Sequence, residues 1–290
     1  MTPTALSSTV SLDQFQDLKC LRIQNDSACA TIFLQGAHLT EYSPIGQTNL
    51  LFVSEQETFS VNEPIRGGVP ICWPWFGSHP TEASAPFHGL VRTCEWQYEI
   101  IRESQQRTDI LLSIETNGED FGFPYLAKAE LLISIGQSLV MSLTTTNLGD
   151  SPFALSQALH TYFPCPDVEQ VTLTGLAGRQ TLNKLTNTSM EFPKNFSFDQ
   201  EVDWIVMDEG QPLLLTGAVK QPIQLTRLGS RSVVVWNPWQ DKAKTLSNFH
   251  PDEFKKMFCI ETANAADDAR LLKPKQTHAM AMEIATLDDQ

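Results

Sequence analysis

A histidine and a glutamate far apart in the chain have the chemistry of an acid–base pair. His160 lies in QALHTYF (157–163), at the end of an apolar segment, and Glu261 lies in MFCIETAN (257–264), an otherwise apolar segment. A buried carboxylate costs free energy unless it is paired or functional, and burial raises its pKa toward the range of a base. A lone histidine more often has a structural role. The glutamate is therefore what makes His160 a candidate for proton transfer.

Two arginines occur in unusual segments and could hold an anion. Arg66 opens RGGVPICWPWFG (66–77), and Arg92 ends FHGLVR (87–92), where it follows His88. Guanidinium groups are well suited to phosphate and carboxylate because their N–H groups form a planar fork. In the alternative interpretation, each arginine is paired with one of the chain's 34 acidic residues.

The segment 66–77 has the composition of an ordered loop. Its two glycines and two prolines would interrupt a strand ladder. Trp75 and the neighbouring aromatic residues offer flat apolar faces that could cover a sugar ring. The same aromatics could instead plug one end of a β-sandwich, and the sequence leaves both interpretations open.

Composition restricts the class of protein. The formal net charge of −14 disfavours nucleic acid and acidic membrane surfaces as partners. The six cysteines form no C-x-x-C pair, the N-terminus lacks the pattern of a signal peptide, and no apolar stretch approaches a membrane span. We therefore expect a cytoplasmic protein with reduced thiols. No metal-binding or nucleotide-binding motif occurs, so we expect no cofactor.

Short segments rich in β-branched and aromatic residues predict a mostly β protein. A hairpin is expected where a short glycine-containing link joins two of them, and one short helix is expected at 248–258. No linker or repeat marks a boundary, so we expect a single β-sandwich domain over 1–290. The expected strands span 29–35, 49–54, 95–101, 109–115, 127–134, 138–147, 221–228 and 232–237.

Five motifs in this order give the chain a strong resemblance to a known family: RGGVPICWPWFG, HGLVR, LHTYF, WNPW and FCIE. The sequence resembles the glucose-6-phosphate 1-epimerase branch of the aldose 1-epimerase family over most of its length. The resemblance implies an all-β fold, a galactose-mutarotase-like β-supersandwich of antiparallel sheets with few short helices. It also implies interconversion of the α and β anomers of a hexose 6-phosphate, glucose 6-phosphate above all, without a cofactor.

The resemblance assigns roles to individual residues. His160 matches the family's general acid and Glu261 its general base, while Arg66 and Arg92 match residues that bind the sugar phosphate. Asp203 in EVDWIV matches a substrate-binding aspartate.

Other positions extend or depart from this pattern. We also expect His88 and Trp75 to contact substrate. Trp204 stands where the family usually has an arginine, and Phe87 stands where some relatives have a polar ligand-binding side chain.

Two alternatives to a hexose-6-phosphate epimerase remain open. One is a non-catalytic module that binds sugar phosphates, and the other is an epimerase for unphosphorylated aldoses. Lys242 and Lys244 could add positive potential, although solvated surface lysines are the simpler interpretation. One of Trp236 and Trp239 should line the pocket and the other should lie in the core. We expect the protein to act as a monomer.

Overall fold

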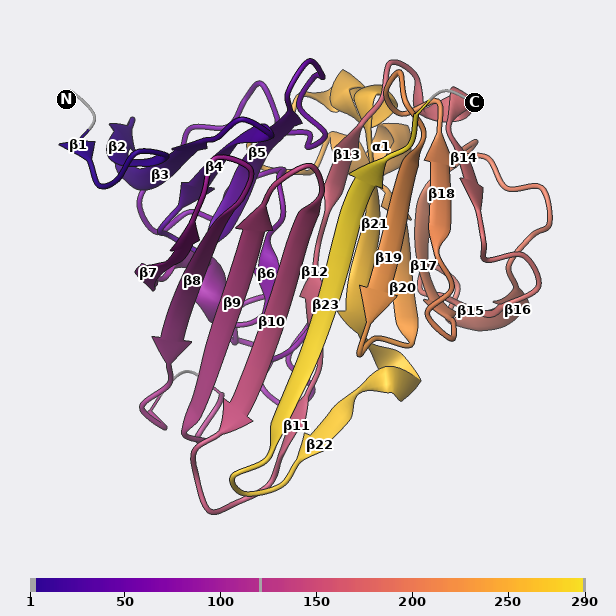
Figure 1. Cartoon of the computed structure of the whole chain (residues 1–290). Helices are drawn as coiled ribbons and strands as arrows, with labels where there is room; N and C mark the ends of the chain where they lie inside the picture. The colour runs from indigo at the N-terminus through magenta and orange to yellow at the C-terminus, as the bar shows by residue number, and fades with distance from the viewer. Residues whose placement is uncertain (1–3, 120–121, 289–290) are drawn as a thin grey trace.

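A computed structural model of the chain describes residues 4–119 and 122–288 and consists mainly of antiparallel strands in several sheets (Figure 1). Two large sheets dominate. The front sheet has eight strands in the order β14-β18-β19-β23-β10-β9-β8-β7. Its strands are β7 (Gln97–Glu103), β8 (Thr108–Glu115), β9 (Ala127–Ile135), β10 (Leu139–Asn147), β14 (Thr172–Thr174), β18 (Leu213–Thr216), β19 (Ile223–Leu228) and β23 (Thr277–Thr286).

Behind it lies the back sheet, in the order β16-β15-β17-β20-β21-β12-β6, with β13 also paired to β21. Its strands are β6 (Ile71–Cys72), β12 (Gln157–Leu159), β13 (Tyr162–Pro164), β15 (Gln180–Asn183), β16 (Thr188–Glu191), β17 (Val202–Met207), β20 (Ser232–Asn237) and β21 (Met257–Asn264).

The remaining strands form a five-stranded N-terminal sheet and a two-stranded pair, and the helices are short. These strands are β1 (Thr4–Ala5), β2 (Val10–Phe15), β3 (Leu18–Gln24), β4 (Ala28–Phe33) and β5 (His38–Pro44), with β11 (Phe153–Leu155) pairing β22 (Arg270–Leu272). The helices of the described residues are α1 (Trp239–Ala243) and the 3₁₀ segments η1 (Val91–Thr93), η2 (Val168–Gln170), η3 (Pro251–Lys256) and η4 (Ala266–Asp268). The expected all-β fold with few short helices is confirmed. No helix of the described residues is long and apolar enough to cross a membrane.

Side-chain alternation along the strands builds the core and fixes which residues face away from it. Leu131 and Ile133 of β9 join Val233 and Val235 of β20 in one buried cluster between the two large sheets. Because successive side chains of a strand point to opposite faces, the intervening residues of the back sheet face outward from this cluster. Glu261 of β21 is one of them, and it lies beside Val234 in the strand register.

The loop 66–77 is ordered, as expected, and it serves both interpretations of its composition. Trp73 is fully buried and donates its indole N–H to Thr145 Oγ1 at 2.9 Å, so this side chain anchors the loop to the core. Gly68 has φ +61°, and a Cβ there would collide with the carbonyl oxygen of Leu39. Only glycine accepts both the backbone conformation and this close approach.

One local prediction was wrong and another is confirmed. Segment 49–54 forms no continuous strand, because its N–H groups bond to three different segments: Leu50 to the Tyr42 carbonyl, Phe52 to Tyr162 and Ser54 to Arg66. The short helix expected within 248–258 is confirmed as η3, which ends at Lys256 because Met257 starts β21. Pro251 and the acidic first turn do begin this segment, as the sequence indicated.

Candidate active site

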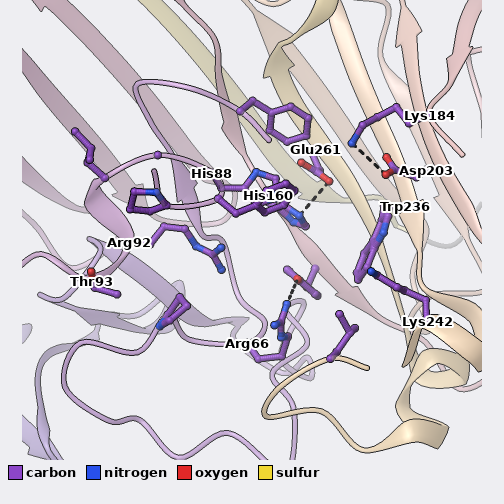
Figure 2. Close-up of a pocket in the computed structure, with 18 of the residues that line it drawn as sticks. Arg66, His88, Arg92, Thr93, His160, Lys184, Asp203, Trp236, Lys242 and Glu261 are labelled. Carbon is purple, nitrogen blue, oxygen red and sulfur yellow. Dashed lines mark hydrogen bonds and ion pairs between the residues drawn. The ribbon is translucent and has the colours of Figure 1, made fainter. Parts of the chain in front are cut away.

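A pocket of about 780 Å³ opens on the outer face of the back sheet (Figure 2). Its floor carries side chains from β17, β20 and β21 and from the β12–β13 connection. The loops that contain Arg66 and His88 form one side together with Arg92 of η1, and Lys242 lies at the rim on α1. Segments from distant parts of the chain therefore converge here.

The structure brings His160 and Glu261 together at the pocket floor. His160 Nε2 lies 3.3 Å from Glu261 Oε1, and the two residues are 9% and 1% exposed. The contact forms because β12 and β13, on either side of His160, both pair with β21. The backbone N–H of His160 donates to the Pro70 carbonyl at 3.0 Å, which holds the β12–β13 connection in place. Among the described residues, neither Glu261 Oε2 nor His160 Nδ1 has a hydrogen-bond partner.

Burial acts in opposite directions on the two members of this pair. It raises the pKa of Glu261 well above its usual value, and the nearby Asp203 carboxylate raises it further. Burial lowers the pKa of His160, and the positive charge of Arg92 adds to this effect. Both shifts favour the uncharged form of the side chain. Between the lowered pKa of His160 and the raised pKa of Glu261, the pair therefore holds one proton. A pair with one proton has one acid and one base.

Arg66 and Arg92 both line the pocket, and neither pairs with an acid within the described part of the chain. Arg66 Nε donates to the Ser247 carbonyl at 3.3 Å, and one Nη lies 3.5 Å from the Tyr162 hydroxyl. Arg92 Nε is buried without a hydrogen-bond partner among the residues described. In a chain of net charge −14, two guanidinium groups without carboxylate partners favour a small anion as ligand.

His88 lines the same pocket beside His160. Its backbone has φ +68°, and its Nδ1 accepts a hydrogen bond from the Gly77 N–H at 3.1 Å. Nδ1 is therefore unprotonated, and the neutral ring carries its proton on Nε2. Burial lowers the pKa of His88, with the charge of His160 as the next contribution. His88 is thus held as a neutral hydrogen-bond donor.

Asp203 lines the pocket and pairs with Lys184, whose Nζ lies 3.1 Å from Asp203 Oδ2. Trp204 points to the opposite face of β17, where its ring lies 5.7 Å from that of Phe192 and 5.4 Å from that of Phe196. The tryptophan that departs from the family pattern therefore does not enter the pocket. Sequence reasoning missed Lys184, because no motif in TLNKL marks it and only the pairing of β15 with β17 brings it to Asp203.

Trp75 lies outside the pocket lining. It is 4% exposed, and its indole N–H donates to the Pro86 carbonyl at 2.9 Å, so it supports the wall from behind. Phe87 lines the rim and is 57% exposed. It presents a ring rather than a polar group at this position.

Of the two tryptophans near WNPW, one lines the pocket and the other packs against the core while partly buried, close to what the sequence suggested, and the two lysines also differ. Trp236 lines the pocket, with its ring 6.0 Å from that of His160, whereas Trp239 packs against Phe254 at 5.1 Å. Lys242 lines the pocket, while Lys244 pairs with Asp241 outside the lining.

Taken together, these groups can bind an anion at one side of the pocket and move protons at its floor. Within residues 4–119 and 122–288, no group of three or more His, Cys, Asp or Glu side chains is placed to hold a metal ion. The pocket's own residues can act by proton transfer and hydrogen bonding.

Comparisons with known proteins agree with this arrangement. The aldose 1-epimerase family model matches residues 19–285. A relative from Cenchrus ciliaris named "Putative glucose-6-phosphate 1-epimerase" is 30% identical, over 86% of this chain and 78% of its own length. A relative of the same name from Escherichia coli K12 is 26% identical, over 97% of this chain and 95% of its own.

Solved structures confirm the expected fold. A crystal structure of a "putative mutarotase" from Salmonella typhimurium superposes with a TM-score of 0.90 at 23% identity, covering 99% of this chain and 96% of the other. A galactose 1-epimerase from Lactobacillus acidophilus superposes with a TM-score of 0.72 at 13% identity, covering 99% of this chain and 100% of the other. The galactose-mutarotase-like β-sandwich is thus the fold of this chain.

Proposed function

The chain belongs to the aldose 1-epimerase family, and on this premise we propose that it interconverts the α and β anomers of a hexose 6-phosphate, with glucose 6-phosphate as its substrate. The observation that carries the proposal is one pocket that holds both a 3.3 Å His160–Glu261 contact and two arginines without carboxylate partners among the described residues. The His160–Glu261 contact supplies an acid and a base, and the two arginines supply a site for the phosphate.

In the proposed mechanism, the single proton of the pair first moves from Glu261 to His160 across their 3.3 Å contact. Glu261, now a carboxylate, then takes the proton of the C1 hydroxyl while His160 donates its proton to the ring oxygen. The C1–O5 bond breaks and C1 becomes an aldehyde. Rotation about C1–C2 then presents the other face of the aldehyde. On closure the C5 hydroxyl attacks C1, His160 takes the hydroxyl proton, and Glu261 returns its proton to O1. The cycle takes up and releases no net proton, so the buried His160–Glu261 pair ends each cycle with the single proton it had at the start.

The arginines act by positioning. With the phosphate held by Arg66 and Arg92, the open-chain aldehyde can rotate at C1 without leaving the pocket. His88 contributes a neutral N–H donor and Asp203 an acceptor for sugar hydroxyls. The same clamp disfavours an unphosphorylated aldose as the main substrate, because such a sugar would leave two cations unneutralised.

The wider setting of the protein is also part of the proposal. We propose that residues 1–290 act as one domain, as a monomer, in the cytoplasm. The core cluster shared by the front, back and N-terminal sheets supports one domain. Cys20, Cys72, Cys165 and Cys259 are buried thiols outside any disulfide, which is consistent with a reducing compartment. Light scattering coupled to size-exclusion chromatography tests the oligomeric state, and a dimer would contradict it.

NMR exchange spectroscopy on glucose 6-phosphate and on glucose tests the function. Faster exchange between the anomers of glucose 6-phosphate, with a much smaller effect on glucose, is the expected result. Equal acceleration of both sugars would favour the epimerase for unphosphorylated aldoses. Calorimetric binding of glucose 6-phosphate without faster exchange would identify a binding module instead.

A further inference from the structure

We propose that Lys184 is a specificity-determining residue that, together with Asp203, recognises the hydroxyl on C2 of the sugar. This inference rests on the proposed function and adds the part of the substrate that the pocket distinguishes. It concerns a lysine that no motif in the sequence marks.

Lys184 is held at the pocket wall by three contacts. Its Nζ lies 3.1 Å from Asp203 Oδ2 and 5.5 Å from the centre of the Phe76 ring, and its backbone N–H donates to the Asp203 carbonyl at 2.9 Å. Its side chain is 31% exposed, which is little for a lysine at the end of a strand. An ammonium group has three donors, and the Asp203 contact uses one of them. Lys184 therefore has donors left for a ligand.

The order of strands places the Lys184–Asp203 ion pair on one side of the catalytic groups and the two arginines on the other. Along the back sheet, Asp203 lies on β17, Glu261 on β21 and His160 after β12, and the loop that begins with Arg66 leads into β6. β20 separates β17 from β21, so the strands that carry Asp203 and Glu261 are about 10 Å apart at the usual strand spacing. Figure 2 shows the same sequence, with Arg92 on one side of the pair and Lys184 with Asp203 on the other.

The covalent structure of a pyranose then decides which hydroxyls meet Lys184. In a hexose 6-phosphate, C6 is attached to C5, next to the ring oxygen, while C2 is the other neighbour of C1. With the phosphate at the arginines and C1 and the ring oxygen at His160 and Glu261, C2 and C3 extend toward β17. A carboxylate beside an ammonium group offers an acceptor and a donor side by side, which complements two adjacent hydroxyls.

A purely electrostatic role for Lys184 is the competing explanation, because its charge also lowers the pKa of Glu261. The two roles differ in one measurable way. A lysine that only acts on Glu261 would change the rate for every sugar 6-phosphate by the same factor. A lysine that bonds the C2 hydroxyl would lose its effect on a sugar that lacks this hydroxyl.

The test therefore combines a change in the protein with a change in the sugar. Exchange rates of glucose 6-phosphate and 2-deoxyglucose 6-phosphate are measured as kcat/KM for the wild type and for Lys184→Met. Hydrogen bonds to charged groups predict that either change alone lowers kcat/KM about ten- to hundredfold, and that the second change then adds little. Lys184→Arg, which keeps a charged donor, should retain most of the preference for the C2 hydroxyl.

Lys244→Met is the matched control, because it removes the same charge from a lysine that pairs with Asp241 outside the pocket lining. It should leave both rates unchanged. Losses that multiply, or a Lys184→Met variant with wild-type rates, would overturn the role of Lys184 while the epimerase activity stands. A wild-type protein that fails to accelerate glucose 6-phosphate exchange would overturn the function and this inference together.

Discussion

Replacing Glu261 by glutamine separates the catalytic role of the carboxylate from its cost to the fold. An amide keeps the shape of the side chain but cannot take a proton. A positioned base contributes about 10²–10⁴-fold to a rate, so kcat for glucose 6-phosphate exchange should fall by at least about a hundredfold. KM should change little, because Arg66 and Arg92 are untouched. NMR exchange spectroscopy gives both constants.

The same substitution should change how stability depends on pH. Unfolded, glutamate and histidine have pKa values of 4.5 and 6.5, so as the pH rises above 6.5 the unfolded chain loses the last proton on these two groups. The folded pair still holds one, because burial raises the pKa of Glu261. Wild-type stability is therefore lost as pH rises above 6.5, by up to about 1.4 kcal/mol per pH unit.

Glu261→Gln removes this loss of stability, since well above pH 6.5 His160 is neutral in both the folded and the unfolded protein. As the pH rises above 6.5, the variant should gain stability relative to the wild type by at most about 1.4 kcal/mol per pH unit, until the raised pKa of Glu261 is passed, measured by urea unfolding at several pH values. The matched control is Glu253→Gln, another buried glutamate, which accepts hydrogen bonds from Ser54 Oγ and the Glu55 N–H, both at 2.7 Å, outside the pocket lining. It should lower stability and leave exchange intact below its melting temperature. A Glu261→Gln variant within tenfold of the wild-type rate, or with no pH-dependent gain, would refute the reasoning.

Three further predictions follow from the pocket and its surroundings. Arg92→Met should lower kcat/KM for glucose 6-phosphate about ten- to hundredfold more than that for glucose, because only the phosphate bonds to this side chain, whereas its charge acts on His160 with either sugar; an equal loss on both sugars would contradict the clamp. The rate of the wild type should persist above pH 4.5, the usual pKa of glutamate, since the raised pKa of Glu261 lets the His160–Glu261 pair keep its proton there; a rate that falls as soon as the pH passes 4.5 would disagree. Trp204→Ala should lower the unfolding free energy by about 3–5 kcal/mol without changing exchange below its melting temperature, because Trp204 is 7% exposed and packs away from the pocket; a large change in KM would argue for a part in binding.

Much of the fold could be predicted from local patterns. Seven of the eight expected strand segments overlap strands of the structure, because alternation and β-branched residues are local signals. The strand Thr277–Thr286 was missed because its alanines and methionines are poor indicators of β structure. It forms because β10 and β19 pair with it on both sides.

Trp204 shows that the direction of a side chain cannot be inferred when its strand, here β17, has not been predicted. The sequence showed that a tryptophan follows Asp203, and it left the consequence for the pocket open. Once β17 is known to be a strand, adjacent side chains must point to opposite faces, so Asp203 and Trp204 cannot both enter the pocket. Lys184 could not be found in the same way, because its contact with Asp203 depends on the pairing of β15 with β17.

The sequence by itself determined the chemical types: an imidazole, a carboxylate in an apolar strand, and arginines beside glycines in an acidic chain. It also determined the alternation that makes the chain a β protein. Only the tertiary structure decided which of these groups meet. The 3.3 Å contact of His160 with Glu261, the arginines without acidic partners among the described residues and the Lys184–Asp203 pair all depend on strand order. Strand order follows from the burial of whole sheet faces, to which every residue of the core contributes and which no short motif encodes.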